Sequence, residues 1–66
     1  MTKHEAIQQL KKGKKLTHRF FDADEYIHLI DDEIHDENGI NINKDFWKYR
    51  TSKSWLNDWE IYTGII

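Results

Sequence analysis

The spacing of apolar residues predicts a helix near the start of the chain, over residues 2–12. Three apolar side chains recur at helical intervals and form a narrow stripe: Ala6, Ile7 and Leu10. Thr2 and Glu5 stand three residues apart, which is the spacing of a capping box. Gly13 follows the two lysines that end the pattern, and a glycine there can adopt the left-handed conformation that ends a helix.

Alternation of apolar and polar residues then predicts strands. We expect the first strand over residues 14–21 and the second over residues 25–30. Asp31 and Asp32 lie between the second expected strand and the next alternating run. They suit the two-residue tip of a hairpin. This tip sets three cross-strand pairs, namely Ile30 with Glu33, Leu29 with Ile34, and His28 with His35. Three side chains then share the core face: Ile27, Leu29 and Ile34.

A second turn follows at residues 37–39. A two-residue Asn-Gly loop would place Ile34 on the face opposite Ile40 and Ile42, whereas a three-residue loop keeps them on one face. We therefore expect the three-residue loop, with Gly39 in the left-handed region. It pairs Asp36 with Ile40 and Ile34 with Ile42.

The last third of the chain is less regular. We expect Ser52 to cap a short helical turn and residues 59–62 to form a final strand, with Trp59 and Ile61 facing inward. The predicted fold class is α+β, in which an N-terminal helix packs on a small antiparallel β-sheet of four to five strands. With 66 residues, we expect a single domain, 1–66.

Composition excludes several classes of protein. The chain has no cysteine, so disulfide frameworks, thiolate metal sites and cysteine nucleophiles are excluded. Its apolar runs are only two or three residues long and its first five residues lack an apolar segment, so we expect no membrane span and no signal peptide. A cytoplasmic protein is the expected outcome. A domain of this size buries little core, which favours a homo-oligomer over a monomer held by its tryptophans.

Charge is distributed unevenly along the chain. Residues 1–19 carry six basic and one acidic side chain, whereas residues 20–43 carry eight acidic side chains and no Lys or Arg. The formal net charge is −2, which argues against a dedicated nucleic-acid-binding protein. Separated charges suit contact between subunits or a binding surface of both signs. The charge of either segment is explained equally well if its side chains form a solvent-exposed face with no binding role.

Signals for catalysis are weak. His28 and His35 are expected to face each other near Glu33, but two histidines and one carboxylate in an inferred register more often form a wet surface than a metal site. No histidine and acid accompany Ser52 or Ser54, and no glycine-rich phosphate loop is present. We expect no metal ligand, no cofactor and no enzyme activity.

Aromatic residues concentrate at the C-terminal end, where they alternate with cations. Residues 44–53 carry Lys44, Lys48, Arg50 and Lys53 among the rings. Aromatic faces stack on nucleobases and neighbouring cations bind phosphates, so this pattern is compatible with a nucleotide ligand. The competing interpretation is a core built from aromatic residues. It is favoured for Trp59, and the two interpretations are balanced for Trp47 and Trp55.

Taken together, three segments resemble one family. They are residues 5–16, the pair Tyr26-Ile27, and the final Asp58-Trp59-Glu60-Ile61. This order resembles the Thoeris anti-defence family of the second type, which are phage proteins that act as molecular sponges. The resemblance implies a helix on an antiparallel sheet, assembly as a dimer or tetramer, and sequestration of a cyclic ADP-ribose-type signalling nucleotide without its degradation.

The resemblance also implies a ligand-binding site. Phe21, at the family's tryptophan position, would stack on the base, and His18 or Arg19 would contact the phosphate. Asp58 would accept hydrogen bonds from ribose hydroxyls or the purine amine, while Trp59 would support it from the core. Trp55 is a further candidate stacking ring. The alternative function is an acidic inhibitor, in which the carboxylates of residues 22–37 bind a basic surface on a host protein. A third hypothesis is a retained fold with another phage role.

Overall fold

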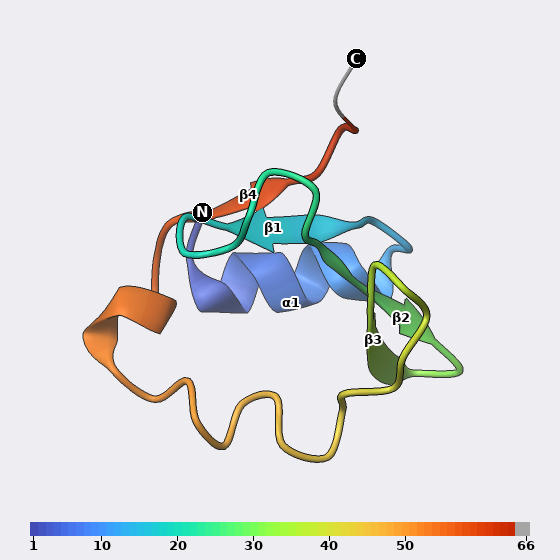
Figure 1. Cartoon of the computed structure of the whole chain (residues 1–66). Coiled ribbons are helices and arrows are strands. Elements are labelled where there is room, and N and C mark those ends of the chain that lie inside the picture. The colour runs from blue at the N-terminus through green and yellow to red at the C-terminus, as the bar shows by residue number, and fades with distance from the viewer. Residues whose placement is uncertain (65–66) are drawn as a thin grey trace.

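The computed structural model describes residues 1–64 and has the predicted α+β arrangement (Figure 1). Helix α1 (Lys3–Lys11) precedes strands β1 (Leu16–His18), β2 (Ile27–Ile30) and β3 (Glu33–Asp36). A 3-10 turn, η1 (Lys53–Trp55), precedes strand β4 (Trp59–Ile61). The four strands form one antiparallel sheet in the order β3-β2-β1-β4. Residues 65 and 66, which the expected domain 1–66 includes, lie outside the described residues.

The start of α1 confirms the predicted capping box. The amide of Glu5 donates to the Thr2 hydroxyl at 3.1 Å, and the amide of Thr2 donates to the Glu5 carboxylate at 2.8 Å. These hydrogen bonds from Thr2 lower the pKa of the Glu5 carboxyl below its ordinary value. At the other end, the amide of Gly13 donates to the carbonyl of Leu10, and Gly13 has a positive φ of 87°. The helix therefore begins and ends at locally encoded signals.

Strand β1 is shorter than the predicted strand over residues 14–21. The chain turns immediately after His18, where the amide of Phe21 donates to the carbonyl of His18 at 2.8 Å. Residues 14 and 15 and residues 19–21 therefore lie outside the strand, although the amide of Tyr62 still donates to the carbonyl of Lys15. Strand β2 is similarly shorter than the predicted 25–30.

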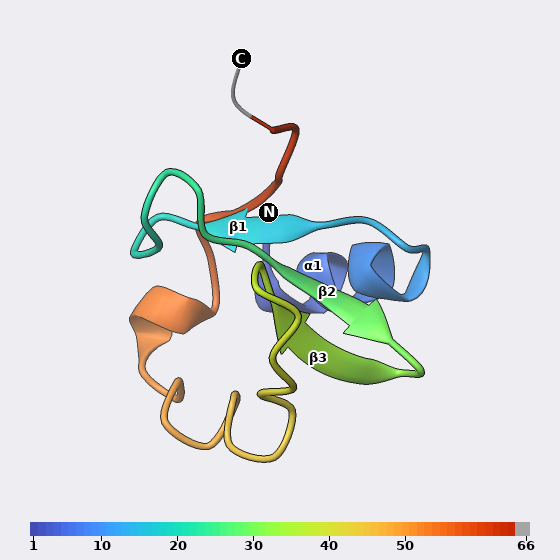
Figure 2. The ribbon, with the colours of Figure 1, turned by 45° about the vertical axis from the view of Figure 1, so that its right-hand side comes forward.

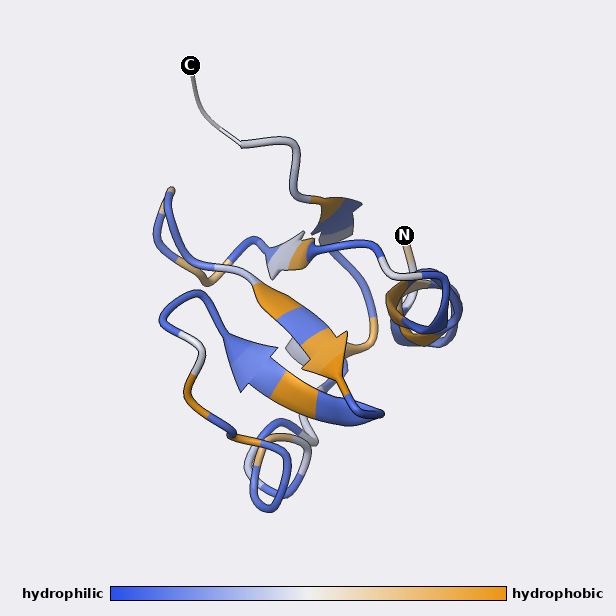
Figure 3. Ribbon diagram, turned by 90° about the vertical axis from the view of Figure 1, so that its right-hand side faces the viewer, coloured by the Kyte–Doolittle hydropathy of each residue, from blue (hydrophilic) through white to orange (hydrophobic). Residues whose placement is uncertain are grey.

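The β2–β3 hairpin has the predicted register. Its strands pair Ile30 with Glu33, Leu29 with Ile34, and His28 with His35. Asp31 and Asp32 form the two-residue tip with positive φ values of 53° and 64°, as a type I′ turn requires. Figure 3 shows the resulting alternation of polar and apolar residues along β2 and β3.

The second turn is also the predicted three-residue loop. The amide of Asp36 donates to the carbonyl of Ile40, and the amide of Ile42 donates to the carbonyl of Ile34. Gly39 has a φ of 79°, which keeps Ile34 and Ile42 in one register. Beyond Asn41, which forms an isolated bridge with His35, the chain leaves the sheet instead of adding a fifth strand.

Two details of the C-terminal prediction are wrong. The helical turn is present at η1, but the side chain of Ser52 makes no capping hydrogen bond. Trp59 is fully buried as expected, whereas Ile61 remains 36% exposed. Strand β4 is an edge strand, so Ile61 has a neighbouring strand on one side only.

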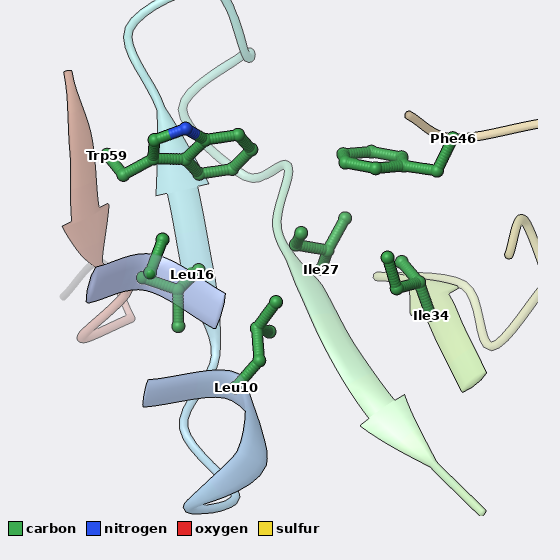
Figure 4. Packing of buried hydrophobic residues seen from close by; sticks show 7 residues of the cluster. Leu10, Leu16, Ile27, Ile34, Phe46 and Trp59 are labelled. Carbon is green, nitrogen blue, oxygen red and sulfur yellow. The ribbon is translucent and has the colours of Figure 1, made fainter. Parts of the chain in front are cut away.

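The core lies between the sheet, α1 and the segment of residues 42–56, which passes below the sheet in Figure 2. The indole of Trp59 reaches across β1 toward Ile27 and Phe46 (Figure 4). Seven hydrophobic side chains make up the buried cluster: Ala6, Leu10, Leu16, Ile27, Ile34, Phe46 and Trp59. None of the helices within residues 1–64 has both the length and the apolar character needed to cross a bilayer.

Candidate functional site

His18 is a buried residue that joins β1 to the turn before β4. It is 3% exposed, and its Nε2 donates to the carbonyls of Ser54 at 2.9 Å and Asn57 at 2.8 Å. Its Nδ1 accepts a hydrogen bond from the amide of Phe20 at 3.1 Å. Because carbonyl oxygens can only accept, this geometry defines a neutral ring that is protonated at Nε2. The expected contact of His18 or Arg19 with a phosphate stays a prediction, and both ring nitrogens of His18 are engaged with the backbone.

Aromatic rings surround His18. The centroid of Trp55 lies 4.2 Å from the His18 centroid, and that of Trp59 lies 4.7 Å away in an edge-on arrangement. Phe21 packs edge-on against Trp59 at 5.8 Å and lies 6.0 Å from Trp55. Phe21 and Trp55 are both half-buried against the core. Phe21 therefore supports the core with a large part of its ring instead of presenting a free face to a base.

Arg19 and Asp58 form the charged part of the predicted site. Their side chains lie 3.6 Å apart, from Nη1 to Oδ2, and remain 71% and 47% exposed. The amide of Arg19 also donates to the carbonyl of Asp58 at 3.2 Å, so the pairing of β1 and β4 determines their proximity. Asp58 has a positive φ of 69°, which turns its side chain out of the strand that follows. An exposed pair of this kind contributes little to stability and is available to a ligand.

Phe20 is the exposed ring of this region, and the sequence pattern did not indicate it. It is 55% exposed, and the guanidinium carbon of Arg19 lies 5.7 Å from its centroid. A strand that continued to residue 21 would have turned Phe20 inward and Phe21 outward, because Leu16 and His18 face the core. The turn at His18 reverses this alternation. The one indication in the sequence is that Phe20 and Phe21 are adjacent, so that one of the two rings is expected to be exposed to solvent.

A shallow hollow of about 610 Å³ lies beside the Arg19–Asp58 pair. The start of α1, strand β4 and the turn before β4 line this hollow. Besides that pair, six residues line it: Met1, Thr2, Glu5, Asn57, Trp59 and Glu60. We refer to the hollow, together with Phe20, as the Arg19 surface. The structure thus gathers all five predicted site residues at one end of the sheet, with Arg19 and Asp58 exposed and His18, Phe21 and Trp55 behind them.

A second hollow of about 440 Å³ lies on the irregular segment. Its lining includes Lys44, Tyr49 and Arg50, together with Asn41, Ile42, Asp45 and Phe46. The guanidinium of Arg50 packs 4.2 Å from the ring of Phe46 and 5.1 Å from that of Trp55, and its Nη1 donates to the carbonyl of Phe46. Arg50 is therefore fixed within the fold, while Tyr49 stands out into solvent. Among the interleaved cations, Arg50 therefore packs this segment, whereas Lys44, Lys48 and Lys53 remain exposed.

Several carboxylates of the acidic segment have local structural roles. The Oδ1 atom of Asp36 accepts hydrogen bonds from the amides of Asn38 and Ile40, each at 2.9 Å. Glu25 accepts from the amide of Asp22, and Asp31 lies in the tight hairpin turn. These bonds hold the turns in place. Part of the acidic segment of residues 22–37 thus takes part in hydrogen bonds within the chain itself.

Comparison of the chain with protein-family models, with curated proteins and with solved structures found no match. Among residues 1–64, no three His, Asp or Glu side chains come close enough to hold a metal ion together. The functional interpretation therefore depends on the geometry of the Arg19 surface.

Proposed function

We propose that this protein binds a cyclic nucleotide of the ADP-ribose type and sequesters it without degrading it. In this role it would act as a phage-type anti-defence sponge in the bacterial cytoplasm. One observation carries the proposal: an exposed aromatic ring, an exposed guanidinium and an exposed carboxylate lie together beside a hollow. These groups belong to Phe20, Arg19 and Asp58.

The chemistry of these three groups matches the three parts of a nucleotide. A phenyl ring stacks on a base, and such stacking contributes about 1–3 kcal/mol per base. A guanidinium binds phosphate oxygens in a bidentate manner, which is the role that we propose for Arg19. The carboxylate of Asp58 accepts hydrogen bonds from a ribose diol. A hollow of about 610 Å³ is within the usual size range for small-molecule sites.

Sequestration is favoured over hydrolysis by the state of the nearby imidazole. Hydrolysis of a phosphate bond benefits from a positioned general base, which is most often a histidine. Both nitrogens of His18 are engaged in hydrogen bonds with the backbone, and the ring is buried. His18 is therefore not available as a general base beside the hollow.

A second copy of the chain would complete the site. The hollow is shallow, and a ligand held only by Arg19, Phe20 and Asp58 would keep one side in water. A dimer or tetramer that brings the basic residues 1–19 of one copy toward the acidic residues 20–43 of another would enclose the ligand. We therefore propose a homo-oligomer as the binding form.

Calorimetric titration of the full chain with cyclic ADP-ribose isomers tests the proposal. We expect binding by the wild type, recovery of intact ligand after heat denaturation, and a loss of roughly 5- to 150-fold in affinity for Phe20→Ala. Arg19→Gln should also weaken binding. Tyr49→Ala is the matched control, because it removes an exposed ring from the second hollow and should bind as the wild type does.

Two outcomes would overturn the proposal. One is the absence of both heat and a melting-temperature shift with every isomer. The other is recovery of a cleaved product in place of the added nucleotide, since this would indicate turnover.

A further inference from the structure

His28 and His35 lie opposite each other on the outer face of the sheet, away from α1. They form a cross-strand pair in the β2–β3 hairpin, with ring centroids 6.4 Å apart and planes inclined by 70°. Both side chains are half-exposed. From the sequence alone this pair is a weak indication of a metal site, because it depends on an inferred register. The structure supplies that register.

A hydrogen bond orients the ring of His35 for coordination. Its Nδ1 lies 2.9 Å from the carbonyl oxygen of Glu33, and a carbonyl can only accept. The proton of the neutral ring is therefore on Nδ1, which leaves the Nε2 lone pair free. Histidines that bind metals commonly donate their other ring N–H to a backbone carbonyl in this way.

The distance between the two rings is close to the one that a shared ion requires. With metal–nitrogen bonds of about 2.0–2.1 Å, two imidazoles bound at a tetrahedral angle have centroids roughly 5 Å apart. The observed 6.4 Å exceeds that by a little more than 1 Å. Rotation about the side-chain bonds of His28 closes such a gap while the hydrogen bond of His35 to Glu33 stays in place.

We propose that His28 and His35 bind one divalent transition-metal ion, of the Zn²⁺, Ni²⁺ or Cu²⁺ type. Imidazole nitrogen suits these ions, whereas Mg²⁺ and Ca²⁺ require oxygen ligands. No third His, Asp or Glu joins the pair within the described residues, so water molecules complete the coordination shell. The carboxylate of Glu33 accepts a hydrogen bond from Asn41 at 3.3 Å and belongs to the surroundings of the site.

The local charge also favours a cation. Residues 20–43 carry eight acidic side chains and no Lys or Arg, so the field over β2 and β3 attracts positive ions. Among the three ions, Cu²⁺ should bind most tightly, as the Irving–Williams order requires. This inference stands on β2 and β3 alone and does not depend on the nucleotide proposal.

Titration of the full chain with Ni²⁺, Zn²⁺ or Cu²⁺, each added as the metal salt, tests the site by calorimetry. We expect one ion per chain and a loss of affinity of about tenfold or more in His28→Gln and in His35→Gln. His4→Gln is the matched control, because His4 is exposed on α1, far along the chain from the pair. It should bind as the wild type does.

A second measurement locates the ion. Substoichiometric Cu²⁺ should broaden the amide resonances of β2 and β3 in the wild type before those of α1. Thermal unfolding of each variant without metal confirms that it remains folded. The proposal is overturned if the wild type binds no ion, if each single variant binds like the wild type, or if His4→Gln removes the binding.

Discussion

The imidazole of His18 and the indole of Trp55 lie with their centroids 4.2 Å apart and their planes inclined by 32°. This contact joins β1 to η1, two elements far apart in the chain. Nε2 of the same imidazole donates to the carbonyls of Ser54 and Asn57, so His18 also holds the turn that leads into β4. The position of Asp58 at the Arg19 surface depends on this turn.

Replacement of His18 by alanine should therefore destabilise the protein strongly. It opens a cavity beside Trp55 and removes the donor to the carbonyls of Ser54 and Asn57, so we expect a loss of about 2–4 kcal/mol in the free energy of unfolding. Urea denaturation measures it. His4→Ala, at an exposed position, should change stability by less than about 0.5 kcal/mol. If His18→Ala is as mild as this control, the assigned role of the buried ring is wrong.

Backbone conformation alone should govern substitutions in the two turns. Gly39 has a φ of 79°, and a Cβ placed there would meet no atom within 4 Å. Gly39→Ala should therefore cost about 1–2 kcal/mol through the left-handed backbone and not through a clash. Asp32→Gly, at a φ of 64°, should have the opposite sign and stabilise the hairpin. Thermal melts of both variants check this difference in sign.

The capping box should make helix stability depend on acid. Hydrogen bonds from Thr2 lower the pKa of Glu5, so the ionised carboxylate stabilises the folded state above the ordinary carboxyl pKa. That contribution is lost as the pH falls through the lowered pKa of the folded state. Glu5→Gln, which keeps the shape of the side chain and removes its charge, should lower stability at neutral pH. The difference between variant and wild type should become smaller at a pH below the lowered pKa of Glu5, as measured by urea denaturation at both pH values. An unchanged difference would contradict the reciprocal bond.

Arg50 should resist replacement by lysine. Its planar guanidinium packs on Phe46 and Trp55 while Nη1 donates to the carbonyl of Phe46. A lysine retains the charge but loses the flat contact and the fixed direction of the donor, so we expect Arg50→Lys to cost about 1–2 kcal/mol. The fluorescence of Trp55 should also shift. Lys48→Arg, at an exposed neighbouring position, is the matched control and should leave stability and emission unchanged.

Features that depend on nearby residues could be predicted from the sequence. The capping box needs only Thr2 and Glu5, and the hairpin register follows from Asp31-Asp32 together with the alternation of apolar residues. The three-residue loop at Gly39 follows from keeping Ile34 and Ile42 on one face. In each case the determining groups lie within a few residues of one another.

Features that depend on distant residues could not be predicted from the sequence. Strand β1 ends at His18 because the imidazole of His18 is hydrogen-bonded to the carbonyls of Ser54 and Asn57. These two residues lie more than thirty positions away in the chain. This turn places Phe20 outside and Phe21 inside. The sequence therefore pointed to Arg19 and Asp58, which the structure brings together, but it named Phe21 where the exposed ring is that of Phe20.

The pairing of β1 with β4 has a consequence for how the protein acquires its structure. β1 is the first strand to be synthesised and β4 is the last, and Trp59 supplies the largest fully buried side chain. A growing chain can form α1 and the β2–β3 hairpin, but it has no closed core until Trp59 reaches His18. Closing so long a loop slows the search for the native state. Folding should therefore occur in one late step, after synthesis has passed β4.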